Sequence, residues 1–359
     1  RTLPGLLAAP DAAARDQLFA AWLKAVGEPE PCDPCAAVAE EPHLTARLDW
    51  IETLTPELKE SLLAIYERRF QGDDRFFVAS APRVANPELT AELDYAALTE
   101  VDAGYRLLAV FRLWNIIEYY FPYRDVIDED WGEVLVDTIP RVLAADTKDA
   151  YQLEMLRFIA RIDDGHSQLW SADPLRPPVG ECQLPVVTRF IEGLPAVVQL
   201  ADGVDAAASA LRPGDAISAL DGAAVGDLVE SWLPFYPGSN LTHRKTGIAR
   251  NLTRGACGPV TVTVDRGGEQ MEIKTERIGD VEPTRYAHDR PGDVFQRLSD
   301  DVAYLKLTGV SGAEVDKYLE GAAGSKGLVI DIRNYPSSFM VFALGQRLIE
   351  EKVDFATIT

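Results

Sequence analysis

The residues best suited to catalysis lie in two short segments of the 359-residue chain. The first is Asp163-Asp164-Gly165-His166-Ser167, in which a histidine follows a glycine. Because an imidazole titrates near neutral pH, His166 is a candidate general base, and Ser167 is a candidate to orient its ring. The alternative, for one of only four histidines in the chain, is a capping or hydrogen-bonding role without catalysis.

The second segment surrounds Ser337 and Ser338. An apolar run from Gly327 to Asp331 predicts a buried strand, which breaks at a polar turn and leads into a helical pattern at residues 339–350. Backbone N–H groups at such a turn also lie at a helix N-terminus, where they can stabilise a negative charge that develops on oxygen. The turn is therefore a candidate oxyanion hole, although any buried strand followed by a helix has this pattern. Neither serine has the flanking glycines of a Gly-x-Ser-x-Gly elbow, which disfavours a nucleophilic role.

A helix must place His166. Apolar residues recur at helical spacing before it, and Asp146 or Thr147 is the predicted N-cap. We expect the helix to stop near Asp163, with Gly165 as its left-handed cap, and His166 to lie between this helix and a short strand formed by the apolar run that follows. The apolar positions are Tyr151, Met155, Leu156, Ile159 and Ile162.

A β-rich module separates the two segments. Arg212-Pro213-Gly214-Asp215 predicts a Pro-Gly turn, and a strand and an Asp-Gly turn follow it. Hairpins are predicted on either side, about Glu192-Gly193 and about Arg266-Gly267-Gly268, and helices at residues 225–233 and 242–252 complete the module. The Arg-Pro-Gly-Asp segment is similar to the core signature of a PDZ-type domain.

The order of these motifs resembles that of the S41 peptidases, the C-terminal processing and tricorn-type serine proteases. The shared order is a helix ending in Asp-Gly-His-Ser, a PDZ-like insert with Arg-Pro-Gly-Asp, and a strand reading Leu-Val-Ile-Asp-Ile-Arg-Asn. It extends from Asp102 to the last residue. The stretch from Tyr105 to Tyr123, followed by Asp130-Trp131, is similar to the helical segment that leads into that family's core. Its apolar stripe is equally what core packing requires.

The resemblance implies an α+β multidomain fold with four regions. These are an N-terminal helical cap region at residues 1–100, a helical part of the peptidase core at 101–175, a PDZ-like β-rich domain at 176–280, and the first part of a crotonase/ClpP-like α/β catalytic core at 281–359. In the first region, amphipathic patterns predict helices at residues 12–26 and 56–70. This region either shields a site or mediates dimerisation, and the sequence leaves open whether the protein forms a homo-oligomer.

The implied activity is that of a serine endopeptidase that cleaves peptides or unfolded protein tails without a cofactor or metal. His166 matches the general base of the tricorn-type branch, whereas other branches use a lysine located after the nucleophilic serine. The family places that serine on a later strand-to-helix turn, so we expect it beyond Thr359. Where the family carries Gly-Gly, this chain has Ser337-Ser338. A serine would be strained at a position that needs a positive φ.

The PDZ-like module is expected to recognise substrate by adding a peptide as a strand to a sheet edge and by binding its terminal carboxylate on backbone N–H groups. The predicted carboxylate-binding loop consists of Gly180, Glu181, Cys182, Gln183 and Leu184. Two other functions stay open. One is a non-catalytic peptide- or ligand-binding protein on the same scaffold, which the Ser-Ser pair favours. The other is a crotonase-type enzyme, which the PDZ-like insert disfavours.

Composition agrees with a large soluble enzyme. The hydrophobic content of 47% is enough for the cores of two or three domains. A formal net charge of −22 opposes binding to phosphate backbones or anionic membranes, so nucleic acid is excluded as an expected partner. The chain holds no run of about twenty apolar residues, the length that a membrane-spanning helix needs.

Cysteine usage and the first residue bear on the compartment. Cys32-Asp33-Pro34-Cys35 has the spacing of a metal half-site or a redox pair, with only His43 nearby as a further ligand, and a local disulfide in an exported protein is favoured. Cys182 and Cys257 both fall in the β-rich module, and their pairing stays open. The chain begins at Arg1 without a methionine, so we expect a periplasmic or secreted protein whose signal peptide lies outside this chain.

Overall fold

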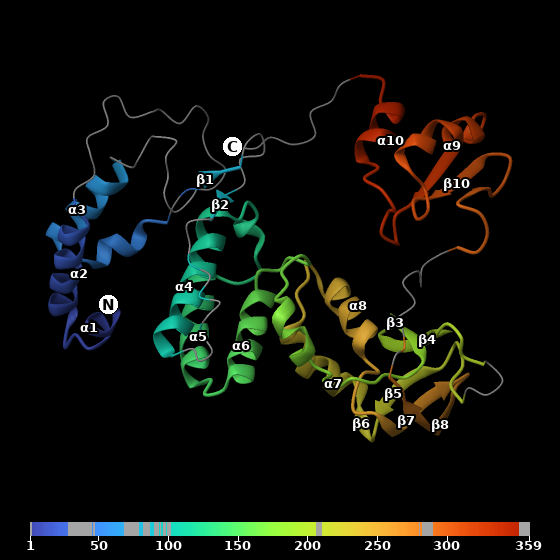
Figure 1. Cartoon of the computed structure of the whole chain (residues 1–359), viewed down its shortest axis with the longest axis horizontal. Coiled ribbons are helices and arrows are strands. Elements are labelled where there is room, and N and C mark those ends of the chain that lie inside the picture. Colours follow the sequence, from blue (N-terminus) through green and yellow to red (C-terminus); the bar gives the residue numbers. More distant parts are fainter. Residues whose placement is uncertain are drawn as a thin grey trace. The chain divides into compact units, whose positions relative to one another are not determined.

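A computed structural model describes the chain at residues 2–27, 45, 47–67, 79–81, 87–89, 93, 95, 98, 102–205, 210–279, 281 and 290–351. The chain divides into two compact units, one extending to Ile127 and the other beginning at Asp128. The pair Cys32 and Cys35 lies outside the described residues. Helices and small, mainly antiparallel sheets make up the chain, which is therefore of the α+β class (Figure 1). No helix in these ranges is long and apolar enough to cross a bilayer.

The described part of the first unit is mainly helical. Both helices predicted there are confirmed, one over residues 12–26 and one that begins at Pro56. A buried ion pair, in which Arg124 donates to Glu118 at 3.0 Å, joins the C-terminal end of α4 to the short 3₁₀ helix that follows it. The elements are α1 (Leu3–Leu7), α2 (Ala12–Val26), η1 (Asp49–Thr53), α3 (Pro56–Glu67), β1 (Ala79–Ser80), β2 (Pro87–Glu88), α4 (Ala103–Tyr120) and η2 (Arg124–Val126).

Two helices open the second unit. α5 (Trp131–Ala144) begins after Asp130, whose carboxylate accepts from two N–H groups of the first turn. α6 (Lys148–Ala160) begins after Thr147, whose hydroxyl oxygen accepts from the first turn at 3.1 Å. Of the two predicted N-caps, Thr147 is therefore the one used. Trp131 and Phe158 stack with their ring centroids 5.4 Å apart, and both are buried, so the two helices share one core.

The β-rich module follows as a six-stranded antiparallel sheet in the order β3-β4-β5-β7-β8, with β6 beside β5. Three of the four predicted turns are confirmed as two-residue hairpin turns, and both central residues have a positive φ at Glu192-Gly193, Asp221-Gly222 and Gly267-Gly268, as type I′ turns require. Helix α8 packs against β3 (Figure 1). The elements are β3 (Val186–Ile191), β4 (Leu194–Leu200), β5 (Ala216–Leu220), β6 (Ala223–Ala224), α7 (Val225–Trp232), η4 (Leu233–Phe235), α8 (Leu241–Asn251), β7 (Gly258–Arg266) and β8 (Glu269–Arg277).

The Arg-Pro-Gly-Asp segment links two strands of this sheet. Gly214 has φ +98°, a value that favours glycine. Asp215 is almost fully buried and accepts from the Arg266 guanidinium at 2.6 and 2.8 Å and from the Arg212 N–H at 2.8 Å. Burial acts to raise the pKa of the Asp215 carboxyl, but these donors outweigh it and hold the pKa below its usual value. The turn before β5 is thus tied to the end of β7.

A disulfide between Cys182 and Cys257 closes the start of the module. Next to it, Cys182 pairs with Gly255 and Gln183 pairs with Ile278 in isolated bridges. Gly180 has φ +150°, and a Cβ there would lie 2.1 Å from the backbone of Gly255, so this close approach needs glycine. The open question about the two cysteines is therefore answered by a covalent link across 75 residues.

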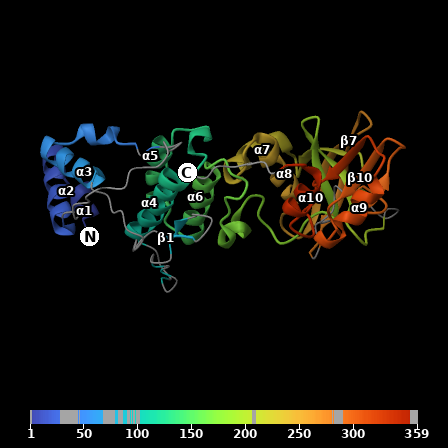
Figure 2. The same ribbon diagram turned by 90° about the horizontal axis from the view of Figure 1, so that it is seen from above.

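The C-terminal segment forms a three-stranded sheet in the order β11-β10-β9, in which β10 and β11 are parallel. Figure 2 shows α9 and α10 beside β10, and buried side chains of all three meet in one core that includes Leu305, Val315 and Leu344. The predicted strand is confirmed, but it is partly exposed rather than buried, and it is a terminal strand in the order of the described sheet. The helix predicted after it is confirmed over Val341–Leu348. The elements are β9 (Phe295–Arg297), β10 (Val302–Lys306), η5 (Gly312–Glu314), α9 (Val315–Ala322), β11 (Gly327–Asp331) and α10 (Val341–Leu348).

Candidate active site

The turn that carries His166 differs from the expected helix cap. Helix α6 ends at Ala160, before Asp163, and the left-handed residue is Asp163, with φ +57°, rather than Gly165. Asp tolerates this conformation better than most residues because its short side chain can hydrogen-bond locally. The expected strand after His166 is also wrong, because Trp170–Leu175 forms a short 3₁₀ helix.

Gly165 is needed for a different reason from the one predicted. A Cβ on this residue would lie 2.7 Å from Cε1 and 2.8 Å from Nε2 of His243. The imidazole of His243 therefore packs directly on the backbone of the turn, in a space that any side chain at position 165 would fill. His243 lies in the first turn of α8, so the β-rich module contacts the residue that precedes His166.

His166 projects from the turn with a side chain that is 100% exposed. The Oδ1 atom of Asp164 accepts from the His166 backbone N–H at 2.8 Å and lies 3.0 Å from its Nδ1. When Nδ1 carries the proton it donates to this carboxylate, and Nε2 keeps its lone pair for an incoming proton. Asp164 thus orients both the backbone and the ring of a solvent-accessible imidazole.

Ser167 acts through its backbone in this turn. Its N–H donates to the Asp164 carbonyl at 3.0 Å and closes the turn that contains His166. The predicted role of Ser167 in orienting the imidazole stays a prediction for its hydroxyl, while its amide holds the backbone on which the imidazole is mounted.

Asp163 joins three parts of the chain at the base of the turn. Its Oδ1 accepts from Nη2 of Arg244 at 3.1 Å, and its Oδ2 accepts from the N–H of Asp128 at 3.1 Å. The same Nη2 of Arg244 also donates to the Ala160 carbonyl at the end of α6, at 2.8 Å. Burial raises the pKa of the Asp163 carboxyl, and the Asp128 N–H and the Arg244 charge only partly oppose this effect.

The second turn is held by its two serines. Ser337 accepts from the Gly309 N–H on its Oγ at 2.5 Å and donates its own N–H to the Leu307 carbonyl at 3.3 Å. The Ser338 hydroxyl donates to the Val310 carbonyl at 3.1 Å. Neither serine has a positive φ, so serine is not strained here. The turn is therefore pinned to the loop after β10, and the Ser337 amide is already engaged.

A charged network fixes the strand end that leads into this turn. Arg333 donates from Nε and Nη2 to the Asp331 carboxylate, at 3.0 and 2.6 Å, and the Tyr304 hydroxyl donates to the same carboxylate at 2.5 Å. The Arg333 hydrogen bonds, with Tyr304, hold the pKa of Asp331 well below its usual value although burial opposes them. Burial and the Asp331 carboxylate raise the pKa of Tyr304.

The predicted carboxylate-binding loop is already bonded at two positions. The Cys182 N–H donates to the Gly255 carbonyl at 3.2 Å, and the Gln183 N–H donates to the Ile278 carbonyl at 3.0 Å. The Leu184 side chain is fully buried in the module's core. These two amides hold the sheet together, which leaves Gly180 and Glu181 as the part of the loop without such a backbone bond to the sheet among the described contacts.

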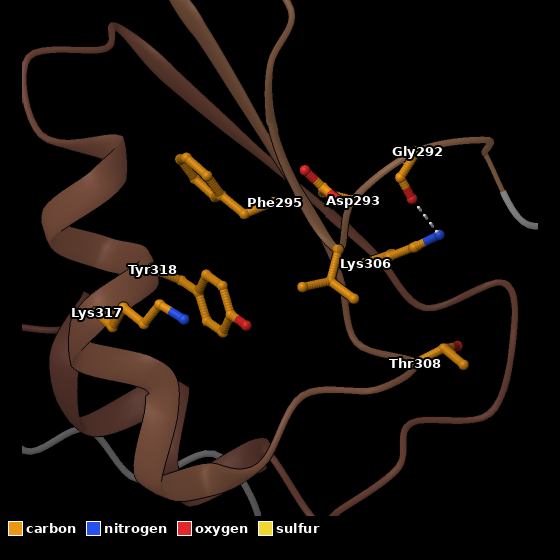
Figure 3. Close-up of a pocket in the computed structure, with 8 residues that line it drawn as sticks. Gly292, Asp293, Phe295, Lys306, Thr308, Lys317 and Tyr318 are labelled. Atoms are coloured by element: carbon orange, nitrogen blue, oxygen red, sulfur yellow. Dashed lines mark hydrogen bonds between the residues drawn. The ribbon is translucent and has the colours of Figure 1, made fainter.

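A pocket of about 630 Å³ lies in the C-terminal segment (Figure 3). The Lys306 ammonium donates to the carbonyls of Arg290 and Gly292 at its rim, both at 3.1 Å. The rings of Phe295 and Tyr318 form the opposite wall, with their centroids 6.0 Å apart. None of the predicted site residues lines this pocket. Within the described ranges, no three His, Cys, Asp or Glu residues gather as metal ligands.

Sequence reasoning missed three residues that shape the two turns. Tyr304 lies in an apolar strand pattern, which indicates burial but no site. Arg244 and His243 lie in a segment whose pattern indicates a helix of the β-rich module but no contact with the turn of His166. Arg244 and His243 contact residues about eighty positions earlier in the chain. Such contacts carry no local pattern, so a search of the sequence by motif could not find them.

Comparison with known proteins gives similarity of fold only. No family model and no curated protein matches the sequence. A serine-to-alanine mutant of CPAF matches with a TM-score of 0.50 and 14% identity, over 67% of this chain and 58% of that chain. Mature CPAF gives 0.44 and 14%, over 64% and 55%, and the photosystem II D1 C-terminal processing protease gives 0.30 and 17%, over 63% and 60%. The chain thus shares the fold of the CPAF mutant at low identity and spans little more than half of its length.

Proposed function

We propose that this chain belongs to a serine endopeptidase of the S41 type, which hydrolyses peptides or unfolded protein tails. Two independent observations support the proposal. The sequence presents Asp-Gly-His-Ser, Arg-Pro-Gly-Asp and Asp-Ile-Arg-Asn in the order of that family. The fold resembles that of the CPAF serine-to-alanine mutant.

The observation that carries the proposal is the arrangement at His166. Its imidazole is fully exposed, yet its backbone and its Nδ1 are both oriented by Asp164. A histidine that served only as a cap would bond its ring to a backbone group, whereas the described contact of the His166 ring is with the Asp164 carboxylate. A general base must reach the proton that it takes and be oriented by a third group, and an accessible ring oriented by Asp164 suits this role.

In the proposed mechanism, a serine located after residue 359 attacks the scissile carbonyl, and Nε2 of His166 takes the serine proton. Asp164 stabilises the imidazolium that forms, and His166 then returns the proton to the leaving amine. Amides of the turn at Ser337 and Ser338 stabilise the oxyanion. This step requires the two turns to meet in the active enzyme, and it requires the Ser337 N–H to leave the Leu307 carbonyl or the Ser338 N–H to serve in its place.

Peptide recognition is proposed at β3, which is a terminal strand in the order of the described sheet and packs beside α8. A substrate peptide would add to this edge through main-chain hydrogen bonds. At Thr188 the strand and the helix are in direct contact, because the hydroxyl donates to the Ala249 carbonyl at 2.6 Å.

An extracytoplasmic location is also proposed. The Cys182–Cys257 disulfide supports it, since disulfides persist in oxidising compartments such as the periplasm and the cell exterior. Reduction should open this link in the cytoplasm, where thiols are kept reduced.

The decisive experiment compares peptide cleavage and peptide affinity for the full-length wild type, His166→Ala and Arg250→Ala. Arg250 is an exposed residue near the end of α8 and serves as the matched control. We expect His166→Ala to lose at least ~10²-fold in kcat while its affinity for peptide changes little, because the loss of a general base leaves a poorly nucleophilic serine hydroxyl. Arg250→Ala should behave as the wild type.

A second function is favoured by one observation, the engaged amide of Ser337. In that case the protein binds peptides or other ligands on the same scaffold without cleaving them. Binding by the wild type without cleavage of any unstructured peptide would establish this alternative. Undiminished cleavage by His166→Ala would instead transfer the role of base to a lysine after residue 359.

A further inference from the structure

We propose that Arg244 is a positioning residue for His166 and acts through Asp163. The inference rests on the proposed role of His166 as the base. Arg244 lies in the β-rich module, whereas Asp163 and His166 lie in the turn after α6, so the module would take part in catalysis by fixing the geometry of the base.

The contact begins with a rigid helix start. Asn240 caps α8, and its side chain accepts from the His243 N–H at 2.8 Å. On the other side, a Cβ on Gly238 would lie 3.0 Å from Cγ of Arg244 and 3.1 Å from its backbone nitrogen, so the chain before α8 packs tightly on this arginine. These contacts fix the first turn of α8, whose side chains contact the turn of His166.

From this helix start, two side chains reach the turn of His166. The Arg244 guanidinium bonds both the last carbonyl of α6, at Ala160, and the carboxylate of Asp163. His243 packs on Gly165. The residues on either side of Asp164 are thus held from α8, and Asp164 is the residue that orients the imidazole.

The chemistry of the contact suits a positioning role. Asp163 holds a left-handed conformation, which is sparsely populated for a residue with a side chain and persists where neighbours fix it. The Arg244 side chain is only 26% exposed and that of Asp163 only 17%, so the pair is better shielded than a surface ion pair. Loss of Arg244 would leave a half-buried carboxylate with one partner fewer at the point where the chain turns toward His166.

The test uses the full-length protein and four variants, Arg244→Ala, Arg244→Lys, Asp163→Asn and the Arg250→Ala control. We expect Arg244→Ala to lower kcat for peptide cleavage about 10-fold or more with KM unchanged within about twofold, because a base displaced by an ångström loses rate rather than binding. Amide exchange over residues 161–167 should become faster. Arg244→Lys should recover part of the rate, since an ammonium keeps the charge but not the planar geometry.

A double variant, Arg244→Ala with Asp163→Asn, separates coupling from general damage. If Arg244 acts through Asp163, the two losses in kcat will be strongly non-additive. Wild-type kcat for Arg244→Ala overturns the inference, and so does a loss confined to KM or to thermal stability, or additive losses. If the wild type cleaves no peptide, the proposed function fails, and if His166→Ala cleaves as fast as the wild type, the role of His166 as the base fails and the inference fails with it. If His166→Ala is inactive while Arg244→Ala is fully active, only the inference fails.

Discussion

The two candidate catalytic turns differ in what they leave free. In the turn of His166, neighbouring residues hold the backbone, and the functional group, an imidazole, is 100% exposed. In the turn of Ser337 and Ser338, the functional groups themselves hold the backbone: both hydroxyls and the Ser337 amide are bonded to the loop from Leu307 to Val310.

The two turns use their polar groups in different ways. A group that is supported by others can act on a substrate, whereas a group that supports its own turn must first exchange a partner. In the proposed enzyme, the base is ready and the oxyanion turn must rearrange or rely on the Ser338 amide. The following predictions change one turn at a time.

The largest effect is expected from Asp164→Asn. The amide oxygen can still accept from the His166 N–H, but the negative charge beside Nδ1 is lost, so the imidazolium that forms during proton transfer is less stable. We expect kcat to fall about 10²-fold, which is less than for a buried triad aspartate because this site is open to solvent. Steady-state peptide cleavage measures it, with exposed Asp202→Asn as the control. A change below threefold would mean that Asp164 is only a backbone cap.

Gly165→Ala should displace the base without removing any polar group. The new methyl would lie 2.7–2.8 Å from the His243 ring, so either the turn or the ring must move. We expect kcat to fall about 10-fold, and we expect Gly165→Ala combined with His243→Ala to regain most of it, since the space is then open. No recovery in the double variant would place the damage in the backbone rather than in the contact with His243.

Replacing Ser337-Ser338 by Gly-Gly should release the second turn. The hydroxyl bonds to Gly309 and Val310 would be lost, and the amide at position 337 could leave the Leu307 carbonyl for an oxyanion. We expect kcat to rise between ~2- and ~10-fold, a fraction of what one oxyanion donor contributes. Exchange of the amides at residues 307–310 should become faster. A fall in kcat would show that the pinned turn is the active one.

The smallest effect is expected on the pH dependence of the unfolding free energy, through Asp331 at the end of the strand that leads into the second turn. The folded-state pKa of Asp331 is lowered, so its contribution to stability is present above the unfolded pKa of about 3.9 and is lost as pH falls through that value toward the folded pKa. Asp331→Asn should lower the unfolding free energy by about 1 kcal/mol at neutral pH, a modest value because Arg333 is largely exposed. Urea unfolding at about pH 6 and about pH 3 should show this difference shrinking in acid, and a constant difference would contradict the assignment.

Much of the fold could be predicted because its signals are local. The N-cap Thr147, the tight turns at Glu192-Gly193 and Gly267-Gly268, and the strand at Gly327–Asp331 each follow from a few neighbouring residues. The end of α6 was misplaced because a glycine near a helix end usually adopts the left-handed conformation. At Gly165 a contact with His243 explains the glycine instead, and Asp163 takes the left-handed position.

The sequence by itself determined which residues have the right chemistry, namely a histidine after Asp-Asp-Gly and a serine pair after an apolar strand. It also determined the strands and turns of the β-rich module, since these depend on periodicity and on residues suited to positive φ. Only the tertiary structure decided that Arg244 donates to the Asp163 carboxylate, that Cys182 pairs with Cys257 and that the Ser337 amide donates to the Leu307 carbonyl. Each of these contacts joins residues distant in the chain, and their energies depend on distance and burial, which a linear pattern does not contain.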